Sequence, residues 1–418
     1  MLVEAQRNPV RRVTGLARST PGRLTLLALG LVALTVLVGA LTAASVQRRS
    51  DALTALADRS EPLAFAAQEV YRAMADADAT AASAFLSGGV ESATLRQRYE
   101  ADVAKAAAAL STATGEITRS PELGEALSTL SQQLPVYTGL VETARAHNRQ
   151  GNPVGAAYLR EASTLMRDRL LPAAQSLYRA EDANVVRDLG GATTLPWLEL
   201  LLGAVLLGAL VAAQRYLTRK TNRLLNVGLV AATAASVVSL LWVLGASVVA
   251  VSGASSSRDD AEVVDVLAQA RIQTLAARRD ETLTLVARGS GGVYEKGFGA
   301  ASDELRGLLD RAGSGAAMTH FERWQQAHQR VREADDRGDY TAAVGLALGS
   351  GPDGAAEAFD ALDGDLRSSL AQARARLTER IAGARGALTG AVPAVVLLAL
   401  VAAVAVAAGL WQRLKEYR

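Results

Sequence analysis

Four long apolar runs limit most strongly what this chain can fold into. They cover Leu24–Val46, Leu195–Ala213, Leu224–Ser252 and Gly386–Trp411, and Glu199 is the only charged residue within them. A bilayer core about 30 Å thick is crossed by roughly 20 apolar residues in a helix, and a charge at its centre costs on the order of 3 kcal/mol. The runs therefore predict four transmembrane helices.

The spacing of these runs predicts the order of domains. Three short basic segments, 1–23, 214–223 and 412–418, alternate with two long ones, 47–194 and 253–385. Four crossings place the short segments on one side of the membrane, and short loops rich in Lys and Arg stay in the cytoplasm. We therefore expect a multi-pass protein of the plasma membrane with both termini inside and both long segments outside.

Two observations leave alternatives to this topology open. Arg48 and Arg49, which follow the first run, favour the opposite orientation, but the basic residues of the short segments outnumber them. A cleaved signal peptide is the other interpretation of the first run. Its apolar core would be about 23 residues, longer than the usual 7–15, so an uncleaved anchor is favoured.

Composition narrows the function classes. The formal net charge is only +2, which gives no sign of nucleic-acid binding. Cysteine is absent, so the long segments have neither disulfides nor thiolate chemistry. Arginine greatly outnumbers lysine and alanine is abundant, a bias that suggests a GC-rich genome.

Both long segments are expected to be helical because Ala, Leu, Arg and Glu, which are good helix formers, dominate them. A seven-residue apolar repeat, interrupted at Ser60, predicts coiled-coil-like packing of the first helix; its members are Leu53, Leu56, Leu63, Ala67, Val70, Met74 and Ala77. Glycine and proline breaks then predict further helices, over about 91–118, 121–149 and up to 189 in the first segment, and over about 259–288, 295–311, 318–336 and a last helix with Leu362 to Ile381 in the second. We expect an all-α membrane protein with two extracytoplasmic, sensor-like antiparallel four-helix bundles.

The two long segments share an order of features that indicates internal duplication. Tyr137 precedes Gly151 by 14 residues, and Trp324 precedes Gly338 by 14. Upstream, the stretch 76–89 resembles 279–292, because each has acids, a helical run and a final glycine pair.

The usual marks of an enzyme are missing. His320 and His328 lie eight residues apart, too far for one metal ion on a helix, and both are expected on the solvated surface. The adjacent acids Asp259-Asp260 and Asp335-Asp336 do not face each other on a helix. The glycine-rich stretch 289–292 lacks the preceding strand and the ending of a phosphate loop. We expect no catalysis, no metal and no cofactor.

Transport is also disfavoured, because carriers place ionisable groups or broken helices at mid-membrane. Glu199 sits one turn inside the outer boundary and is expected to reach toward the interface. Closely spaced small residues predict tight helix contacts and a compact bundle without a pore; they are Gly203, Gly208, Ala231, Ala235, Ala399, Ala403 and Ala407.

Four stretches of the chain resemble an actinobacterial family of four-pass membrane proteins. They are Val136–Ser163, Asp280–Gly289, Trp324–Tyr340 and Arg413–Arg418. In that family an extracytoplasmic solute-binding lipoprotein senses glutamate, aspartate or glutamine. The four-pass protein passes its state to a cytosolic Ser/Thr kinase, protein kinase G, which adjusts nitrogen and 2-oxoglutarate metabolism. The resemblance implies a non-enzymatic signal transducer whose partners are that lipoprotein, the kinase and the lipid bilayer, and it leaves homo-oligomers open.

On this interpretation the repeated features of the outer segments are the expected partner contacts: Asp78, Tyr137, Asn148, Gly151, Asp280, Trp324, Asp336, Gly338 and Tyr340. Core packing for the aromatic residues and helix ends for the glycines are the structural alternatives. Inside, basic residues are expected to bind an acidic partner or anionic lipid, with lipid favoured for each segment alone; they are Arg215, Arg219, Lys220, Arg223, Arg413, Lys415 and Arg418.

Two other functions stay open on the sequence. Helical bundles of this kind can bind a small ligand between their helices, which would make the chain a direct receptor. A scaffold of the cell envelope, for division or wall synthesis, is the other.

Overall fold

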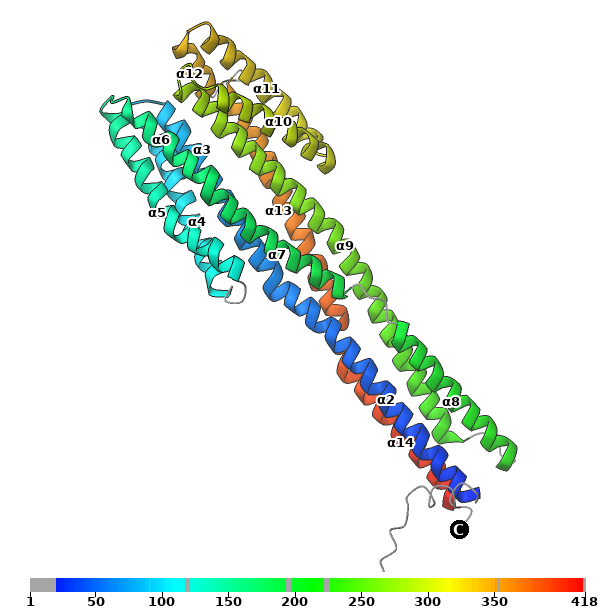
Figure 1. Ribbon diagram of the computed structural model, residues 1–418. Helices are drawn as coiled ribbons and strands as arrows, with labels where there is room; N and C mark the ends of the chain where they lie inside the picture. Colours follow the sequence, from blue (N-terminus) through cyan, green and yellow to red (C-terminus); the bar gives the residue numbers. More distant parts are fainter. Residues whose placement is uncertain are drawn as a thin grey trace, which may run out of the picture. The chain divides into compact units, whose positions relative to one another are not determined.

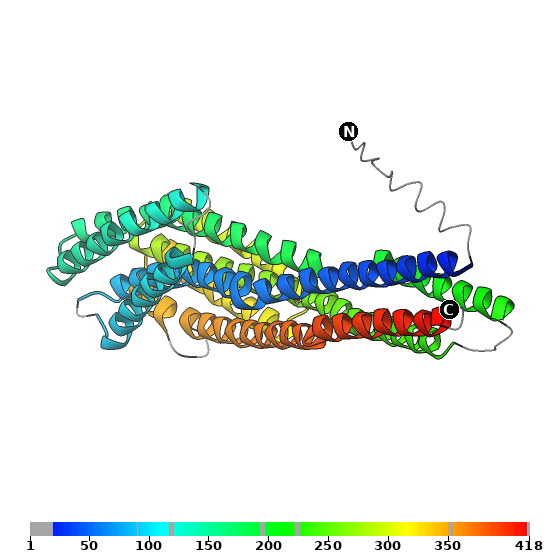
Figure 2. The same cartoon turned by 90° about the horizontal axis from the view of Figure 1, so that it is seen from below.

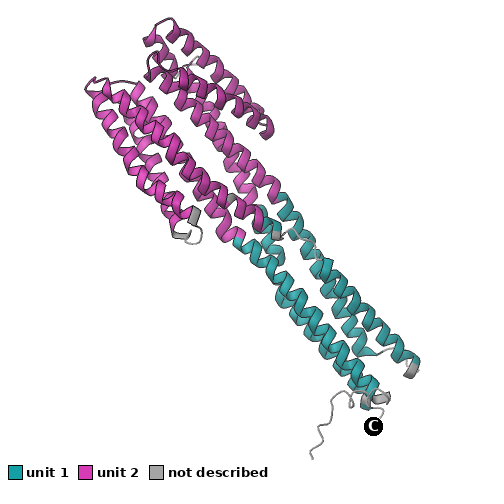
Figure 3. Ribbon diagram, in the orientation of Figure 1, with its two compact units in different colours: residues 1–55, 189–256, 380–418 teal, residues 56–188, 257–379 magenta. Residues whose placement is uncertain are grey.

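The computed structural model describes residues 20–89, 91–116, 121–192, 197–221, 226–349, 351 and 354–415. Within these ranges every regular element is a helix, which confirms the all-α prediction (Figures 1 and 2). The chain forms two compact units (Figure 3). Unit 1 contains residues 1–55, 189–256 and 380–418, and unit 2 contains residues 56–188 and 257–379.

Unit 1 holds the apolar runs. Its main helices are α2 (Thr20–Ala55), α8 (Trp197–Thr221), the part of α9 (Val227–Val286) up to residue 256, and α14 (Ala391–Lys415). The described residues include four helices long and apolar enough to cross a membrane. The structure thus supports a membrane protein, while the orientation of the termini stays a prediction.

Glycine permits the close approach of α9 to α14 in unit 1. A Cβ atom added at Gly228 would collide with the carbonyl oxygen of Ala405 and with the Cα atom of Gly409. Asn226 reinforces the approach, since its Nδ2 donates to the carbonyl oxygen of Gly409 at 2.9 Å. Backbones that come this close gain dispersion contacts that larger side chains would prevent.

The small residues singled out in the sequence divide into two groups. Ala399 lies against Gly39 of α2, and a side chain at Gly203 would collide with Leu240 of α9. Gly208 has open space beside it, and Ala407 is exposed. Tight helix contacts therefore form at some of the predicted positions, not at all of them.

An ion pair links α2 to α8 within unit 1. Glu199 is only 7% exposed, and its Oε1 lies 3.7 Å from Nη2 of Arg49. Arg49 also donates from Nη1 to the hydroxyl of Ser247 at 3.1 Å. A basic residue of a neighbouring helix thus neutralises the charge of Glu199 inside unit 1, and the expected reach of Glu199 toward the membrane interface stays a prediction.

The first soluble segment, residues 56–188, contributes four long helical stretches to unit 2. They are the π-turn η1 (Leu56–Ser60) with α3 (Glu61–Leu86), then α4 (Ala93–Glu116), α5 (Pro121–Arg149), and α6 (Val154–Leu165) with the π-turn η2 (Met166–Leu170) and α7 (Leu171–Ala192). The helix ends agree with the predicted breaks within a few residues. All seven members of the apolar repeat are buried, and Ser60, which interrupts it, donates to Oδ2 of Asp188 at 2.6 Å.

The second soluble segment, residues 257–379, has a similar order. It contains the end of α9, α10 (Gly292–Ala312), α11 (Gly315–Asp336), the short α12 (Tyr340–Leu348) and most of α13 (Ala355–Leu388). The α12 helix was not predicted as a separate element. Asp339 precedes it and caps it, because its Oδ1 accepts the backbone N–H of Ala342 at 3.0 Å.

One hydrophobic core serves both soluble segments. Tyr137, Leu130 and Met166 of the first segment belong to the same buried cluster as Trp324, Phe321 and Leu305 of the second. Around it α3 packs on α4, α5 on α6, and α11 on α12 (Figure 1). The arrangement in two separate four-helix bundles is not confirmed, since the two segments form one compact unit.

Candidate functional site

Each soluble segment buries an aromatic residue that donates to a carboxylate. The hydroxyl of Tyr137 on α5 donates to Oδ1 of Asp78 on α3 at 3.3 Å. The indole Nε1 of Trp324 on α11 donates to Oε2 of Glu281 on α9, also at 3.3 Å. Asp78 and Glu281 occupy the same position, the third, in the two similar stretches 76–89 and 279–292. This match supports the internal duplication.

Two further features repeat between the segments, an arginine–glutamate ion pair and a glycine turn. Arg145, eight residues after Tyr137, pairs with Glu91 at 3.0 Å, and Arg332, eight residues after Trp324, pairs with Glu295 at 3.4 Å. The glycines that follow, Gly151 and Gly338, have φ values of +67° and +80°. Only glycine adopts this conformation without strain, so each ends its helix with a turn.

His328 is a buried part of the second repeat, and its expected place on the solvated surface is wrong. Its side chain is 6% exposed, its Nδ1 lies 3.1 Å from Glu281, and its Nε2 lies 3.1 Å from Glu295. The ring stacks on Phe298. Burial alone would lower the pKa of His328, but the hydrogen bonds to the two glutamates outweigh it and raise the pKa to about 9. His328 is therefore a cation at neutral pH.

Among the residues that the structure describes, none that is basic lies within hydrogen-bonding distance of Asp78, the matching acid of the first repeat. Its Oδ1 accepts from Tyr137 and from the hydroxyl of Ser163 at 3.0 Å. Its Oδ2 is buried without a partner. Burial raises the pKa of Asp78, and the charge of Arg279 and the two hydrogen bonds oppose this shift only in part.

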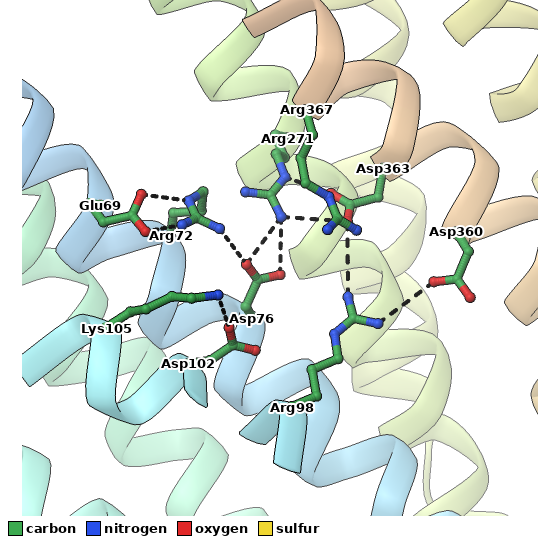
Figure 4. A network of polar contacts seen from close by, with 10 residues as sticks. All are labelled: Glu69, Arg72, Asp76, Arg98, Asp102, Lys105, Arg271, Asp360, Asp363 and Arg367. Carbon is green, nitrogen blue, oxygen red and sulfur yellow. Dashed lines mark hydrogen bonds and ion pairs between the residues drawn. The ribbon is translucent and has the colours of Figure 1, made fainter. Parts of the chain in front are cut away.

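A buried ion network joins the two soluble segments inside unit 2 (Figure 4). At its centre, Nη2 of Arg271 on α9 lies 3.0 Å from Oδ2 of Asp76 on α3, and its Nε lies 2.5 Å from Oδ1 of Asp363 on α13. All three residues are at most 4% exposed. Arg72 also pairs with Asp76 at 3.0 Å, and Arg367 with Asp363 at 2.5 Å. None of these residues was singled out in the sequence.

Two cavities lie beside these charged residues. One of about 370 Å³ is lined by Asp76, Arg98, Arg278 and Asp360, together with the hydroxyl-bearing residues Thr80, Ser83 and Ser87. The other, of about 200 Å³, is lined by Asp78, Arg279 and Arg167. Within the described ranges no three His, Asp or Glu residues form a group that could hold a metal ion. The cavities therefore offer charged and polar groups suited to a small polar molecule.

The structure buries four of the predicted outer contact residues. Asp78, Tyr137, Asp280 and Trp324 are each at most 6% exposed, so in this conformation they pack inside unit 2 and a rigid partner does not reach them. Tyr137 and Trp324 thus pack in the core, which is the structural alternative to a partner contact.

The remaining outer residues lie closer to the surface. Asn148 donates to the carbonyl oxygen of Phe85 at 2.9 Å, Tyr340 lies under the guanidinium of Arg288, and Asp336 is exposed beside Arg332. Gly151 and Gly338 end helices, which is the structural alternative to a partner contact. Contact of the exposed residues with a partner stays a prediction.

The predicted inner contacts are only partly described. Arg215 and Arg219 are exposed on α8, and Lys415 is exposed with its Nζ 4.0 Å from the ring centre of Trp411. The backbones of Lys220 and Arg413 belong to α8 and α14, but their side chains are outside the described part of the chain. Arg223 and Arg418 lie outside the described residues altogether.

Comparison with known protein families gives a match to part of the chain. Residues 52–190 match the family model described as an actinobacterial sensor domain. This range contains the whole first soluble segment, including Asp78, Tyr137 and Ser163. Neither curated proteins nor solved structures give a match to the chain. The match supports a sensor-type actinobacterial protein with a sensing or signalling role, and the four apolar helices support a place in the membrane.

Proposed function

We propose that the chain is a non-enzymatic transmembrane signal transducer, with unit 2 outside the cell and unit 1 in the bilayer. The observation that carries this proposal is α9, which is one uninterrupted helix from Val227 to Val286. Its first part is apolar and belongs to unit 1, and its last part carries Arg271 and Glu281 in unit 2. A change of packing around those residues acts on a rod that continues through the apolar run.

The energy that such signalling needs is small. Helix shifts of about 1–2 Å or a slight rotation are typical of such switches, and a coupling of about 1–3 kcal/mol between two sites is sufficient. Buried ion pairs favour a few discrete packings, because an intermediate position would leave a charge without its partner. The network around Arg271 therefore suits a two-state element.

The finer form of the proposal follows the family resemblance. Unit 2 reads the state of an extracytoplasmic lipoprotein that binds glutamate, aspartate or glutamine. The basic segments 214–223 and 412–418 pass that state to a cytosolic Ser/Thr kinase that controls nitrogen and 2-oxoglutarate metabolism. The sensor-domain match over residues 52–190 supports the sensing role alone, and the exposed Arg215, Arg219 and Lys415 are the groups that an acidic partner would contact.

An insertion in α9 tests the role of the continuous helix. Three glycines added after Ser256 would uncouple the two parts of α9, because a run of glycines melts a helix locally. We expect the change in kinase-substrate phosphorylation that follows amino-acid addition to be lost in cells, with normal membrane insertion. The matched control places the same glycines after Gly313, in the turn between α10 and α11, and should respond normally. An unchanged response in the α9 variant would contradict the proposal.

Removal of residues 412–418 tests the inner half. We expect the truncated chain to recover less of the kinase in a pull-down from crosslinked cells. Equal recovery would remove the tail from the mechanism. A deletion strain with altered cell shape but a normal amino-acid response would instead indicate an envelope scaffold.

A direct receptor is the second candidate, and the two cavities in unit 2 favour it. A receptor of this kind would be stabilised against heat by a small ligand alone. A transducer that reads only a lipoprotein would be stabilised only when the lipoprotein is added.

A further inference from the structure

The cavity of about 200 Å³ in unit 2 combines buried and accessible polar groups. Asp78 and Tyr71 reach it from α3, Arg167 from η2, and Gln273 and Arg279 from α9. Arg167 is 42% exposed, so the cavity has a side toward solvent. The volume holds several water molecules or a small organic molecule. Arg167 lies in a π-turn, a deviation that is frequent at functional sites.

Asp78 supplies the observation that points to a ligand. The residue is 1% exposed and lines the cavity, yet its Oδ2 has no partner. A buried polar atom without a partner costs about 1–3 kcal/mol, and a buried ion without one costs more. Tyr137 and Ser163 already occupy Oδ1 as donors. Oδ2 of Asp78 therefore remains available for a hydrogen bond to a bound ligand.

The charges around the cavity decide what that group is. Arg279 is 7% exposed and carries its charge at the cavity wall, with Asp280 bound to its Nε at 2.9 Å. Arg167 adds a second guanidinium, paired with Asp168 at 2.9 Å. Burial raises the pKa of Asp78, which favours its neutral acid form. A neutral Asp78 can donate a hydrogen bond from Oδ2. Together with the guanidinium groups of Arg279 and Arg167, this donor suits the cavity to a negatively charged acceptor.

We propose that this cavity binds the carboxylate of a small organic acid, with Arg279 as the charged partner and Asp78 as a hydrogen-bond donor. Gln175 and Gln273, which also line the cavity, provide amide groups for the rest of the molecule. Occupancy would connect α3, η2 and α9 through one ligand. The biological use of the site rests on the proposed sensory function, but its test does not.

Thermal unfolding of the full-length protein in detergent tests the site. The probes are propionate, lactate and succinate, compared with propylamine at equal ionic strength. We expect at least one carboxylate to raise the melting temperature by about 2–4 °C at saturation, and propylamine to have no effect. Arg279→Gln should weaken that carboxylate at least about tenfold. Arg311→Gln, at an exposed arginine outside the cavity, is the matched control and should bind normally.

Variants at Asp78 distinguish an anion site from a cation site. Asp78→Asn keeps an acceptor for Tyr137 and Ser163 and a donor toward the cavity, so it should retain carboxylate binding. Asp78→Leu should lose it while its helical circular dichroism stays that of the wild type. Binding of propylamine that Asp78→Asn abolishes would overturn the proposal, as would no shift with any carboxylate.

The two proposals can fail separately. If no carboxylate binds but the glycine insertion in α9 still abolishes signalling, the site is wrong and the transducer stands. If binding is found but the insertion leaves signalling intact, the site stands and the transduction route is wrong.

Discussion

At the scale of single residues, His328 links the stability of unit 2 to pH. Its pKa of about 9 in the folded protein lies above the ordinary value of 6.5. The bound proton therefore contributes stability that is fully present below pH 6.5 and is lost as the pH rises through 9. The full effect is about 3 kcal/mol. We expect the melting temperature of the wild type to fall between pH 6.5 and 9.5.

His328→Gln is the control for this pH effect. It keeps hydrogen-bonding capacity beside Glu281 but cannot take up a proton, so its melting temperature should change much less over the same range. An equal fall in wild type and variant would show that another group is responsible.

Arg271 gives the second prediction at this scale. Arg271→Met would remove the cation that Asp76 and Asp363 share. Each acid keeps another arginine, Arg72 or Arg367, so the cost should lie below that of a fully broken buried pair, about 3–5 kcal/mol, but above that of an exposed pair. Arg306→Met removes an exposed pair with Glu322 and should cost less than about 1 kcal/mol. Chemical unfolding of the full-length protein compares them. Similar costs for the two variants would contradict a structural role of the network.

What the sequence indicated about individual residues differs from case to case. The shared spacing of Tyr137 and Trp324 correctly marked equivalent positions, but their burial depends on tertiary packing that spacing does not encode. The Arg271 network escaped notice because its partners lie 195 and 92 residues away along the chain. For His328 the spacing from His320 says nothing about burial, because the glutamates that hold its ring lie 47 and 33 residues away along the chain.

At the scale of elements, helix ends could be predicted because glycine and proline act locally. The α3, α5 and α11 helices end within a few residues of the expected breaks. The π-turns η1 and η2 were not predicted, because a single inserted residue in a helix leaves no compositional mark. The short α12 was missed because its nine residues are too few to show a helical period.

The contact of α9 with α14 carries a prediction for unit 1. Gly228→Val would force the two backbones apart and should destabilise the protein by about 1–3 kcal/mol. Gly208→Val on α8 has open space around it and should behave like the wild type. Melting temperatures in one detergent measure both effects. A larger fall in melting temperature for the Gly208 variant than for the Gly228 variant would contradict the open space beside Gly208 on α8.

At the scale of the whole molecule, the topology is open to direct measurement. The chain has no cysteine, so a single introduced thiol reports its own location. Ser92→Cys and Asp303→Cys are at exposed positions in unit 2, and Arg219→Cys is at an exposed position in unit 1. We expect an impermeant maleimide to label the first two in intact cells and the third only after lysis. The reverse labelling pattern would show that the protein has the opposite orientation in the membrane.

The number of compact units was the main feature that local patterns could not provide. Apolar runs predicted four crossings and helix propensity predicted helical soluble segments, since both are properties of short stretches. Whether two similar segments fold apart or together depends on the side chains where they meet, and here that includes one arginine held between Asp76 and Asp363.

That shared arginine also bears on the history of the chain. Asp76 corresponds to Arg279 in the second copy, so the two repeats have taken opposite charges at a matching position. Each acid that shares Arg271 also has an arginine from its own segment, Arg72 for Asp76 and Arg367 for Asp363, so each copy offsets part of its own charge and shares Arg271 with the other. A chain that lost the second copy would keep Asp76 with one cation in place of two.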